Sequence, residues 1–250
     1  DTDLTVRVSL SGTQAVAGDS VRLYDGASAL GTAVTLSASD ISNGFVDVQT
    51  GALSDAAYAL SAKITDLAGN TSSAATAHNV TVDTSVPAAP AIASSALTNN
   101  ATPTLSGTAL AGSSVTVTVG GATYTTTATG GNWSINLASA TPASGTLSLN
   151  ANGSNPVSVT ATNTAGTSST PTTQSLVIDT TAPNTPAITS VTDGVGSITG
   201  AVASGGVTDD TDLTVRVSLS GTQAVAGDSV RLYDGASALG TAVTLSASDI

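Results

Sequence analysis

The ionisable side chains of this 250-residue chain are almost all aspartates. All 17 acidic residues are Asp, against five Lys and Arg and one His, and the net charge is −12. Short carboxylates at turns suit two kinds of chemistry: hydrogen bonding to the backbone of tight turns and coordination of a hard cation such as calcium. The chain has no cysteine and nothing that resembles a nucleophile–base pair. We therefore expect no disulfide scaffold and no enzymatic activity.

The aspartates are unevenly distributed along the chain. Eight lie in residues 1–82 and seven in residues 193–249, whereas residues 84–178 contain no charged side chain. The other two, Asp83 and Asp179, stand at the edges of that neutral segment. A role in solubility alone would use Glu as freely as Asp and would spread the charge over every surface. We assign turn capping to about half of the aspartates, including Asp19, Asp25, Asp40 and Asp55.

The chain carries an internal repeat at both of its ends. Residues 1–41 recur without a change as residues 210–250, an offset of 209. A fainter repeat relates VDTSVPAAPAI at 82–92 to IDTTAPNTPAI at 178–188, 96 positions later. The period of 209 residues therefore divides into alternating units of 96 and 113 residues, and each has the size of one compact domain.

These spacings predict three parts. Residues 1–82 are the later part of a 113-residue unit, which we call type A, without its first strand. Residues 83–178 are a complete 96-residue unit, called type B, and residues 179–250 begin another type A unit. Both ends of the sequence are thus expected to lie within a type A unit. The proline pairs in the shared segments stiffen the junctions, because proline fixes φ.

Alternating apolar and polar residues predict β-strands throughout the chain. Apolar side chains occupy every second position at 6–10, 58–64 and 115–119, and no window favours the spacing of a helix. Asp25-Gly26 and Gly120-Gly121 are hairpin signals. About seven short strands per roughly 100 residues are typical of an immunoglobulin-like sandwich. We therefore expect an all-β chain of tandem immunoglobulin-like β-sandwich domains in an elongated array.

Three motifs in the right order carry a family resemblance. They are the linkers DTSVPAAPAI and DTTAPNTPAI, the turn TDLAGNTS at 65–72, and the strand GGNWS at 130–134. Together they resemble bacterial Ig-like repeats, which build the extender regions of giant Bap-like and RTX-type surface adhesins, and the resemblance covers essentially the whole chain. It implies an extracellular stalk on the bacterial surface, often stiffened by calcium, that holds an adhesive tip away from the cell and supports biofilm formation.

The strand order of such a sandwich predicts where the aspartates meet. The loop between the first two strands lies at the end where the chain leaves the domain, and the turn between the last two lies where it enters. In a type A unit, acids in the first loop should therefore approach the outgoing linker, and Asp66 in the last turn should approach the incoming one. We expect calcium at these junctions, with backbone carbonyls and water completing its six to eight oxygens. The candidate ligands are Asp1, Asp3, Asp66, Asp83, Asp179, Asp193, Asp209, Asp210 and Asp212.

The type B unit has neutral counterparts of these acids. Asn163 stands where type A has Asp66, and the first loop offers Asn99 and Asn100. An amide supplies an oxygen but no charge. We therefore expect ions to stiffen the A-to-B junction, which could gather Asp1, Asp3 and Asp83, more than the B-to-A junction, which retains Asp179.

Two other classes of function stay open on the sequence alone. One is a module that binds glycans or host proteins through its loops or through Trp133 and Tyr124, although such a Trp is more simply a core residue. The other is a surface-layer or matrix protein that assembles laterally. No apolar run reaches the ~18 residues of a membrane span, and the negative charge argues against nucleic acid. The expected partners are neighbouring repeats and calcium ions, and the expected form is a monomeric rod.

Overall fold

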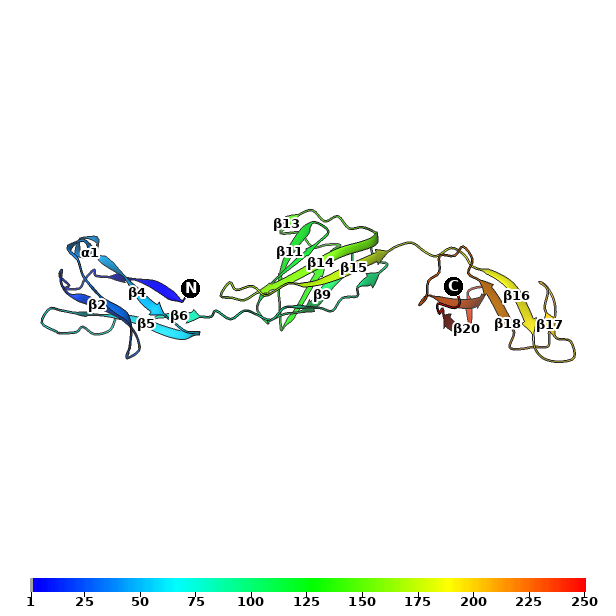
Figure 1. The fold of residues 1–250 in the computed structure, drawn as a ribbon, viewed down its shortest axis with the longest axis horizontal. Helices are drawn as coiled ribbons and strands as arrows, with labels where there is room; N and C mark the ends of the chain where they lie inside the picture. Colours follow the sequence, from blue (N-terminus) through cyan, green and yellow to red (C-terminus); the bar gives the residue numbers. More distant parts are fainter. Residues whose placement is uncertain (1) are drawn as a thin grey trace. The chain divides into compact units, whose positions relative to one another are not determined.

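The computed structural model of the protein describes residues 2–250. The chain divides into two compact units, Asp1–Asp179 and Thr180–Ile250. Two β-sandwiches make up the first unit: we call residues 2–82 the N-terminal sandwich and residues 83–179 the central sandwich. Residues 180–250 are called the C-terminal unit. Strands form all three parts (Figure 1), and the all-β, tandem immunoglobulin-like fold class is confirmed.

The N-terminal sandwich has two sheets around one apolar core. One sheet pairs β1 (Asp3–Ser9) with β4 (Phe45–Ala52), and the other has the order β3-β2-β5-β6. The bounds of that second sheet are β2 (Ser20–Asp25), β3 (Ser28–Thr35), β5 (Ala56–Thr65) and β6 (His78–Val82). Apolar residues at every second position face inward, and Val21, Leu23 and Val48 are fully buried between the sheets.

A short helix, α1 (Ala38–Asn43), joins β3 to β4, where apolar periodicity predicts none. The capping residues at its two ends specify the helix. Ser37 accepts a hydrogen bond from the Asp40 N–H, the Asp40 carboxylate accepts one from the Ser37 N–H, and Gly44 closes the helix at φ 77°. This capping box satisfies backbone groups that a helix of six residues otherwise leaves unpaired.

The central sandwich contains a six-stranded sheet and a three-stranded sheet, with the orders β13-β11-β10-β14-β15-β8 and β12-β9-β7. Their bounds are β7 (Ala91–Ile92), β8 (Leu97–Thr98), β9 (Thr104–Thr108), β10 (Ser114–Val119), β11 (Ala122–Thr127), β12 (Asn132–Asn136), β13 (Ser144–Gly145), β14 (Asn152–Thr162) and β15 (Thr172–Asp179). Leu147 and Leu149, which alternate as in a strand, lie outside any strand but still pack against the core.

Trp133 fills the middle of the central core. It is 2% exposed, and its indole N–H donates to the carbonyl of Ala91, 3.2 Å away. A Cβ on Gly107, its cross-strand partner, would lie 1.9 Å from that carbonyl oxygen and 2.8 Å from the indole ring. Position 107 therefore requires glycine. The N-terminal sandwich has Val8 opposite Val46 at the corresponding pair. Two side chains of medium size there take the place of one large indole and one glycine.

The C-terminal unit repeats part of the N-terminal sandwich in a different setting. One sheet has the order β17-β16-β18, with bounds Gly200–Ala201, Ala187–Asp193 and Thr214–Ser218, and the hairpin β19 (Ser229–Asp234) and β20 (Ser237–Thr244) forms the other. Strands β18, β19 and β20 repeat the sequences of β1, β2 and β3. Among the described residues, β1 pairs with β4 whereas β18 pairs with β16.

Candidate functional site

Asp83 lies where the chain enters the central sandwich. Its carboxylate accepts hydrogen bonds from the N–H and the hydroxyl of Ser85, and the hydroxyl holds the pKa of Asp83 below its usual range. The Asn163 amide nitrogen, from the turn between β14 and β15, lies 3.3 Å from the Asp83 carboxylate and 3.1 Å from the Ser85 carbonyl. The last turn of this sandwich thus contacts its incoming linker, as the strand order predicts.

The first loop of the central sandwich lies beside its outgoing linker. Leu97 and Thr98 pair in parallel with Val177 and Ile178 at the end of β15. Asn99 and Asp179 line one shallow surface hollow there.

At the outgoing end of the N-terminal sandwich, residues 53–55 contact both the start of β1 and the linker. The Leu53 N–H donates to the Thr2 carbonyl at 2.7 Å, and the Asp55 carboxylate accepts from the N–H and hydroxyl of Thr84 at 3.0 and 2.8 Å. The start of β1 and the linker are therefore held by the same turn.

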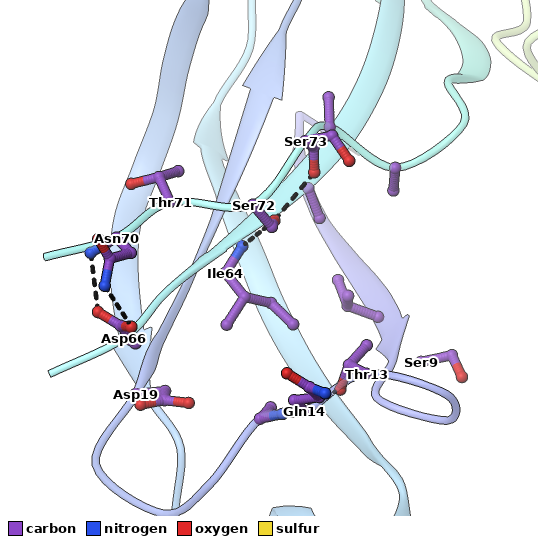
Figure 2. A pocket seen from close by; sticks show the side chains of 15 residues that line it. Ser9, Thr13, Gln14, Asp19, Ile64, Asp66, Asn70, Thr71, Ser72 and Ser73 are labelled. Carbon is purple, nitrogen blue, oxygen red and sulfur yellow. Dashed lines mark hydrogen bonds between the residues drawn. The ribbon is translucent and has the colours of Figure 1, made fainter. Parts of the chain in front are cut away.

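Asp66 organises the last turn of the N-terminal sandwich (Figure 2). Its carboxylate accepts hydrogen bonds from the backbone N–H groups of Ala68 and Asn70 and from the Asn70 side chain, at 2.8 to 2.9 Å. The Asn70 side chain is the main cause of a lowered pKa at Asp66. Asn163 holds the corresponding turn of the central sandwich by accepting from the Thr167 N–H at 2.8 Å.

Three further candidates lie near the end of β16. Asp193 is 7% exposed and accepts from the Val195 N–H and the Thr208 hydroxyl. Asp210 accepts from the N–H groups of Gly194 and Asp212 at 2.7 and 2.8 Å, and the Gly194 bond lowers its pKa. The Asp209 carboxylate occupies the space that a Cβ at Gly196 would need.

The candidate ligands thus fall into separate places. Asp3 begins β1, Asp66 and Asp83 lie in different turns, and Asp179 ends β15. Asp193 ends β16, and Asp209, Asp210 and Asp212 lie between β17 and β18. Within residues 2–250, no three acidic or histidine side chains converge closely enough to hold a metal ion. Asp1 lies outside the described residues. Calcium binding stays a prediction.

The aspartates assigned to turn capping all accept backbone hydrogen bonds. Asp19 accepts from Val16 and Asp40 from Ser37, each within its own turn. Asp25 and Asp55 reach further along the sequence and accept from Ala59 and Thr84.

A cavity of about 600 Å³, which sequence reasoning missed, lies beside β1 (Figure 2). Val8, Thr13, Asp19, Ile64 and Ser72 are among the residues that line it, and we call it the β1-edge cavity. Residues 1–82 are expected to be without the first strand of a type A unit, and this expectation is the sequence signal for a hollow beside β1.

The interpretation of Trp133 as a core residue is confirmed, and an aromatic platform at Trp133 and Tyr124 is excluded. Trp133 and Tyr124 are 2% and 1% exposed, so they belong to the core of the central sandwich and cannot form a platform on which a glycan stacks.

Tandem sandwiches with linkers held by their end turns define a chain of immunoglobulin-like domains. The model of the bacterial Ig-like domain family matches residues 6–84 and 91–180, and the chain belongs to that family. The resemblance to bacterial Ig-like repeats is therefore confirmed. No curated protein matches the sequence. No helix within residues 2–250 has the length and apolar character that a membrane crossing needs.

Several solved structures are similar to the chain. The fibronectin(III)-like modules of Clostridium thermocellum CbhA share 17% identity over 71% of this chain and 86% of that chain, with a TM-score of 0.41. A tetra-tandem repeat in the extending region of a large adhesion protein shares 18% identity over 80% of this chain and 54% of that one, with a TM-score of 0.32. An amphioxus IgVJ-C2 molecule shares 11% identity over 70% and 96%, with a TM-score of 0.26.

Proposed function

We propose that this chain is a segment of the stalk of a bacterial surface adhesin of the Bap-like or RTX type. Tandem bacterial Ig-like domains and a 41-residue segment repeated without change support a role in which the number of units sets the reach of the protein. The observation that carries the proposal is the way the linker Asp83–Ser85 is held. Asp55 binds Thr84 from the preceding sandwich, and Asn163 binds Asp83 and Ser85 from the following one.

A linker held from both sides suits a stiff spacer. Hydrogen bonds to its backbone and side chains restrict the rotations that a free linker would keep. In this proposal the segment lies outside the cell, its partners are the neighbouring repeats of the same chain, and it supports adhesion and biofilm formation as a monomeric rod.

Calcium is part of the proposal at the A-to-B junction. In a complete type A unit, the loop that carries Asp193, Asp209, Asp210 and Asp212 ends at the first residues of β1, which the Leu53–Asp55 turn holds next to the linker. The Asp83 carboxylate would complete an acidic group there. Several carboxylates in one place raise one another's pKa unless a cation neutralises them. At the B-to-A junction, Asn99 provides only a neutral oxygen beside Asp179.

Calcium titration of the 250-residue chain tests the ion. We expect calcium to raise the melting temperature and to lengthen the particle in small-angle scattering, and Asp83→Asn to reduce both effects more than the matched change Asp179→Asn. An unchanged melting temperature and an unchanged length with calcium would contradict the calcium proposal. That outcome would not contradict the stalk proposal.

Labelling of intact cells tests the stalk. Antibodies to residues 84–178 should bind the surface of unpermeabilised cells, and deletion of whole 209-residue periods should weaken attachment without removing surface display. Cells labelled only after permeabilisation would overturn the stalk. Binding of a glycan by the chain, or sheet formation that grows with concentration, would favour a binding module or a surface-layer protein instead.

A further inference from the structure

The outer face of the four-stranded sheet in the N-terminal sandwich carries two cations side by side. Val21 and Leu23 of β2 are fully buried, so Arg22 between them points to the other face of the sheet. Lys63 of the neighbouring strand β5 lies directly opposite Arg22 (Figure 1). Both side chains are half-buried. Because like charges directly opposite each other destabilise a sheet, this pair costs the sandwich stability.

Neither cation has an acidic partner. Within residues 2–250 the one ion pair joins Arg7 to Asp47. Arg22 donates to the Gly31 carbonyl at 3.2 Å, and its Nε–H is buried with no hydrogen-bond partner in the described chain. A buried donor without an acceptor costs free energy. The guanidinium is therefore only partly satisfied by the protein.

Tyr24 positions the lysine. It lies two residues after Arg22 on the same face of β2, and the Lys63 ammonium stands 4.9 Å from the centroid of its ring. An ammonium at that distance from an aromatic ring is attracted to it. The ring thus holds the second positive charge over the sheet, close to the first.

The acids at the two ends of β2 do not neutralise this face. Asp19 is buried, and its carboxylate accepts a hydrogen bond from the Val16 N–H. Asp25 lies opposite the buried Leu60, on the core side of the sheet, and its carboxylate accepts from the Ala59 N–H. The outer face of β2 and β5 is therefore positive in a chain whose net charge is −12.

The central sandwich shows that the fold does not need these cations. Thr160 precedes the last turn of that sandwich by the same three positions by which Lys63 precedes its own. Thr116 lies directly opposite Thr160, in the place of Arg22. Two neutral hydroxyl side chains thus complete the same pair of strands. A ligand on this face explains the cation pair better than packing within the sandwich does.

We propose that Arg22, Lys63 and Tyr24 form a binding site for the carboxylate groups of an acidic polysaccharide. A guanidinium can donate two parallel N–H groups to one carboxylate, and an ammonium adds a compact charge. Ser20 and Ser61, on the same face, offer hydroxyls to the sugar. The site goes beyond the stalk and does not depend on it, so its loss would leave surface labelling of cells unchanged.

The carboxylates of a second copy of this chain suit the site less well. Asp66 and Asp83 each accept hydrogen bonds from backbone N–H groups of their own turns. Asp210 accepts from two backbone N–H groups in the same way. Such a carboxylate would have to give up these bonds to reach Arg22. The carboxylates along a polysaccharide have no such partners to lose.

Titration of the full 250-residue chain with an oligogalacturonate tests the site. Calcium is left out, because it could bridge the ligand to aspartates, and the salt is kept at about 0.15 M, where a Debye length of about 8 Å screens distant charges. We expect NMR shifts centred on residues 20–24 and 61–65, and much weaker binding of a matched neutral oligogalactoside. Absence of binding, or equal binding of the neutral sugar, would overturn the site. Inorganic sulfate that binds as tightly as the oligogalacturonate would contradict a polysaccharide as the ligand.

Variants that copy the central sandwich locate the binding. R22T/K63T should weaken it about tenfold or more, because two charge-assisted contacts are lost. Lys63→Thr alone keeps the hydrogen bond from Arg22 to Gly31 and should show part of that loss, which decides the matter if the double variant does not fold. Arg231→Thr is the matched control, because Arg231 repeats Arg22 in residues 180–250, which contain no lysine, and it should leave the affinity unchanged.

Two further outcomes would contradict the proposal. Glycan binding that R22T/K63T keeps would place the site elsewhere and favour a binding module. Self-association that grows with protein concentration and is removed by R22T/K63T would make the aspartates of a second copy the occupant. Sedimentation of the unchanged chain and of the variant, without ligand, measures this, and we expect both to stay monomeric.

Discussion

Residues 3–41 and 212–250 have the same sequence and form the same β-hairpin, but their burial is very different. In both copies the hairpin has one register, with Tyr24 opposite Ala29 and Tyr233 opposite Ala238. A guanidinium donates to the same glycine carbonyl in each, from Arg22 at 3.2 Å and from Arg231 at 3.0 Å. The register of this hairpin is therefore specified by the segment itself.

The core is not specified in this local way. Leu23 is fully buried in the first copy, and its counterpart Leu232 is half-buried. Val34 is half-buried, whereas Val243 is 62% exposed. The first copy is covered by β4 and β5, which come from residues 45–65, and those residues have no counterpart in the C-terminal unit. One sequence can thus form its hairpin without the remainder of its sandwich, but it cannot bury its apolar face.

Removal of the same leucine from each copy should give the largest difference between them. Leu23→Ala deletes a side chain at 0% exposure and leaves a cavity, which costs about 2–5 kcal/mol. Leu232→Ala removes a side chain that water already reaches, so we expect about 1 kcal/mol or less. Calorimetry measures both losses, and the fluorescence of Trp133, in the central sandwich, should report an unchanged transition. Equal losses at both sites would mean that the two copies share one core environment.

This difference also explains how much of the fold could be predicted from the sequence. Strand alternation and turn residues act locally, so the all-β class and the hairpin at Asp25-Gly26 follow from the letters alone. The position of Asn163 beside the linker follows from strand order, and the structure places it there. The β1-edge cavity and the partners of Asp25 and Asp55 depend on residues distant in the sequence.

Two local features were still missed, for different reasons. Helix α1 is specified by the capping pair Ser37 and Asp40 and by Gly44, not by a stripe of apolar residues. Leu147 and Leu149 alternate as strand residues do, but they bury their side chains without joining the sheet. Periodicity reports which side chains are buried and does not report which backbone groups pair.

The helix cap gives a second comparison between the two copies, with an expected loss of stability of intermediate size. Ser37 and Asp40 bond reciprocally and α1 forms. In the second copy Ser246 donates to the Asp249 carboxylate from its N–H and its hydroxyl, but the Asp249 N–H donates to the Ser246 carbonyl and no helix follows. Ser37→Ala should therefore cost about 1 kcal/mol, the usual loss for a helix N-cap. Ser246→Ala should have a clearly smaller effect, because fewer backbone groups depend on it. Thermal unfolding measures both, with Ser37→Thr as the variant that keeps a capping hydroxyl; a loss at Ser246 as large as at Ser37 contradicts the comparison.

Arg7 and its copy Arg216 should give the smallest difference in stability between the two copies. The pH dependence of that difference shows its cause. Arg7 donates to both oxygens of Asp47 at 2.8 Å and lies 3.9 Å from the ring of Phe45, whereas its copy Arg216 forms no ion pair within residues 2–250. The Arg7 hydrogen bonds lower the pKa of Asp47. A carboxylate with a lowered folded-state pKa adds stability above its unfolded value, about 3.9, and that contribution is lost as the pH falls through the folded value.

Arg7→Ala should therefore lower the melting temperature slightly at pH 7, because an exposed ion pair contributes little. The difference from the unchanged protein should shrink as the pH falls below about 4 and vanish once Asp47 is protonated. Arg216→Ala should have no effect at either pH. Melting curves from pH 7 to pH 2 measure this. If the loss of melting temperature for Arg7→Ala persists undiminished at pH 2, the contribution comes from packing on Phe45, which does not titrate. The ion pair would then not distinguish the two copies.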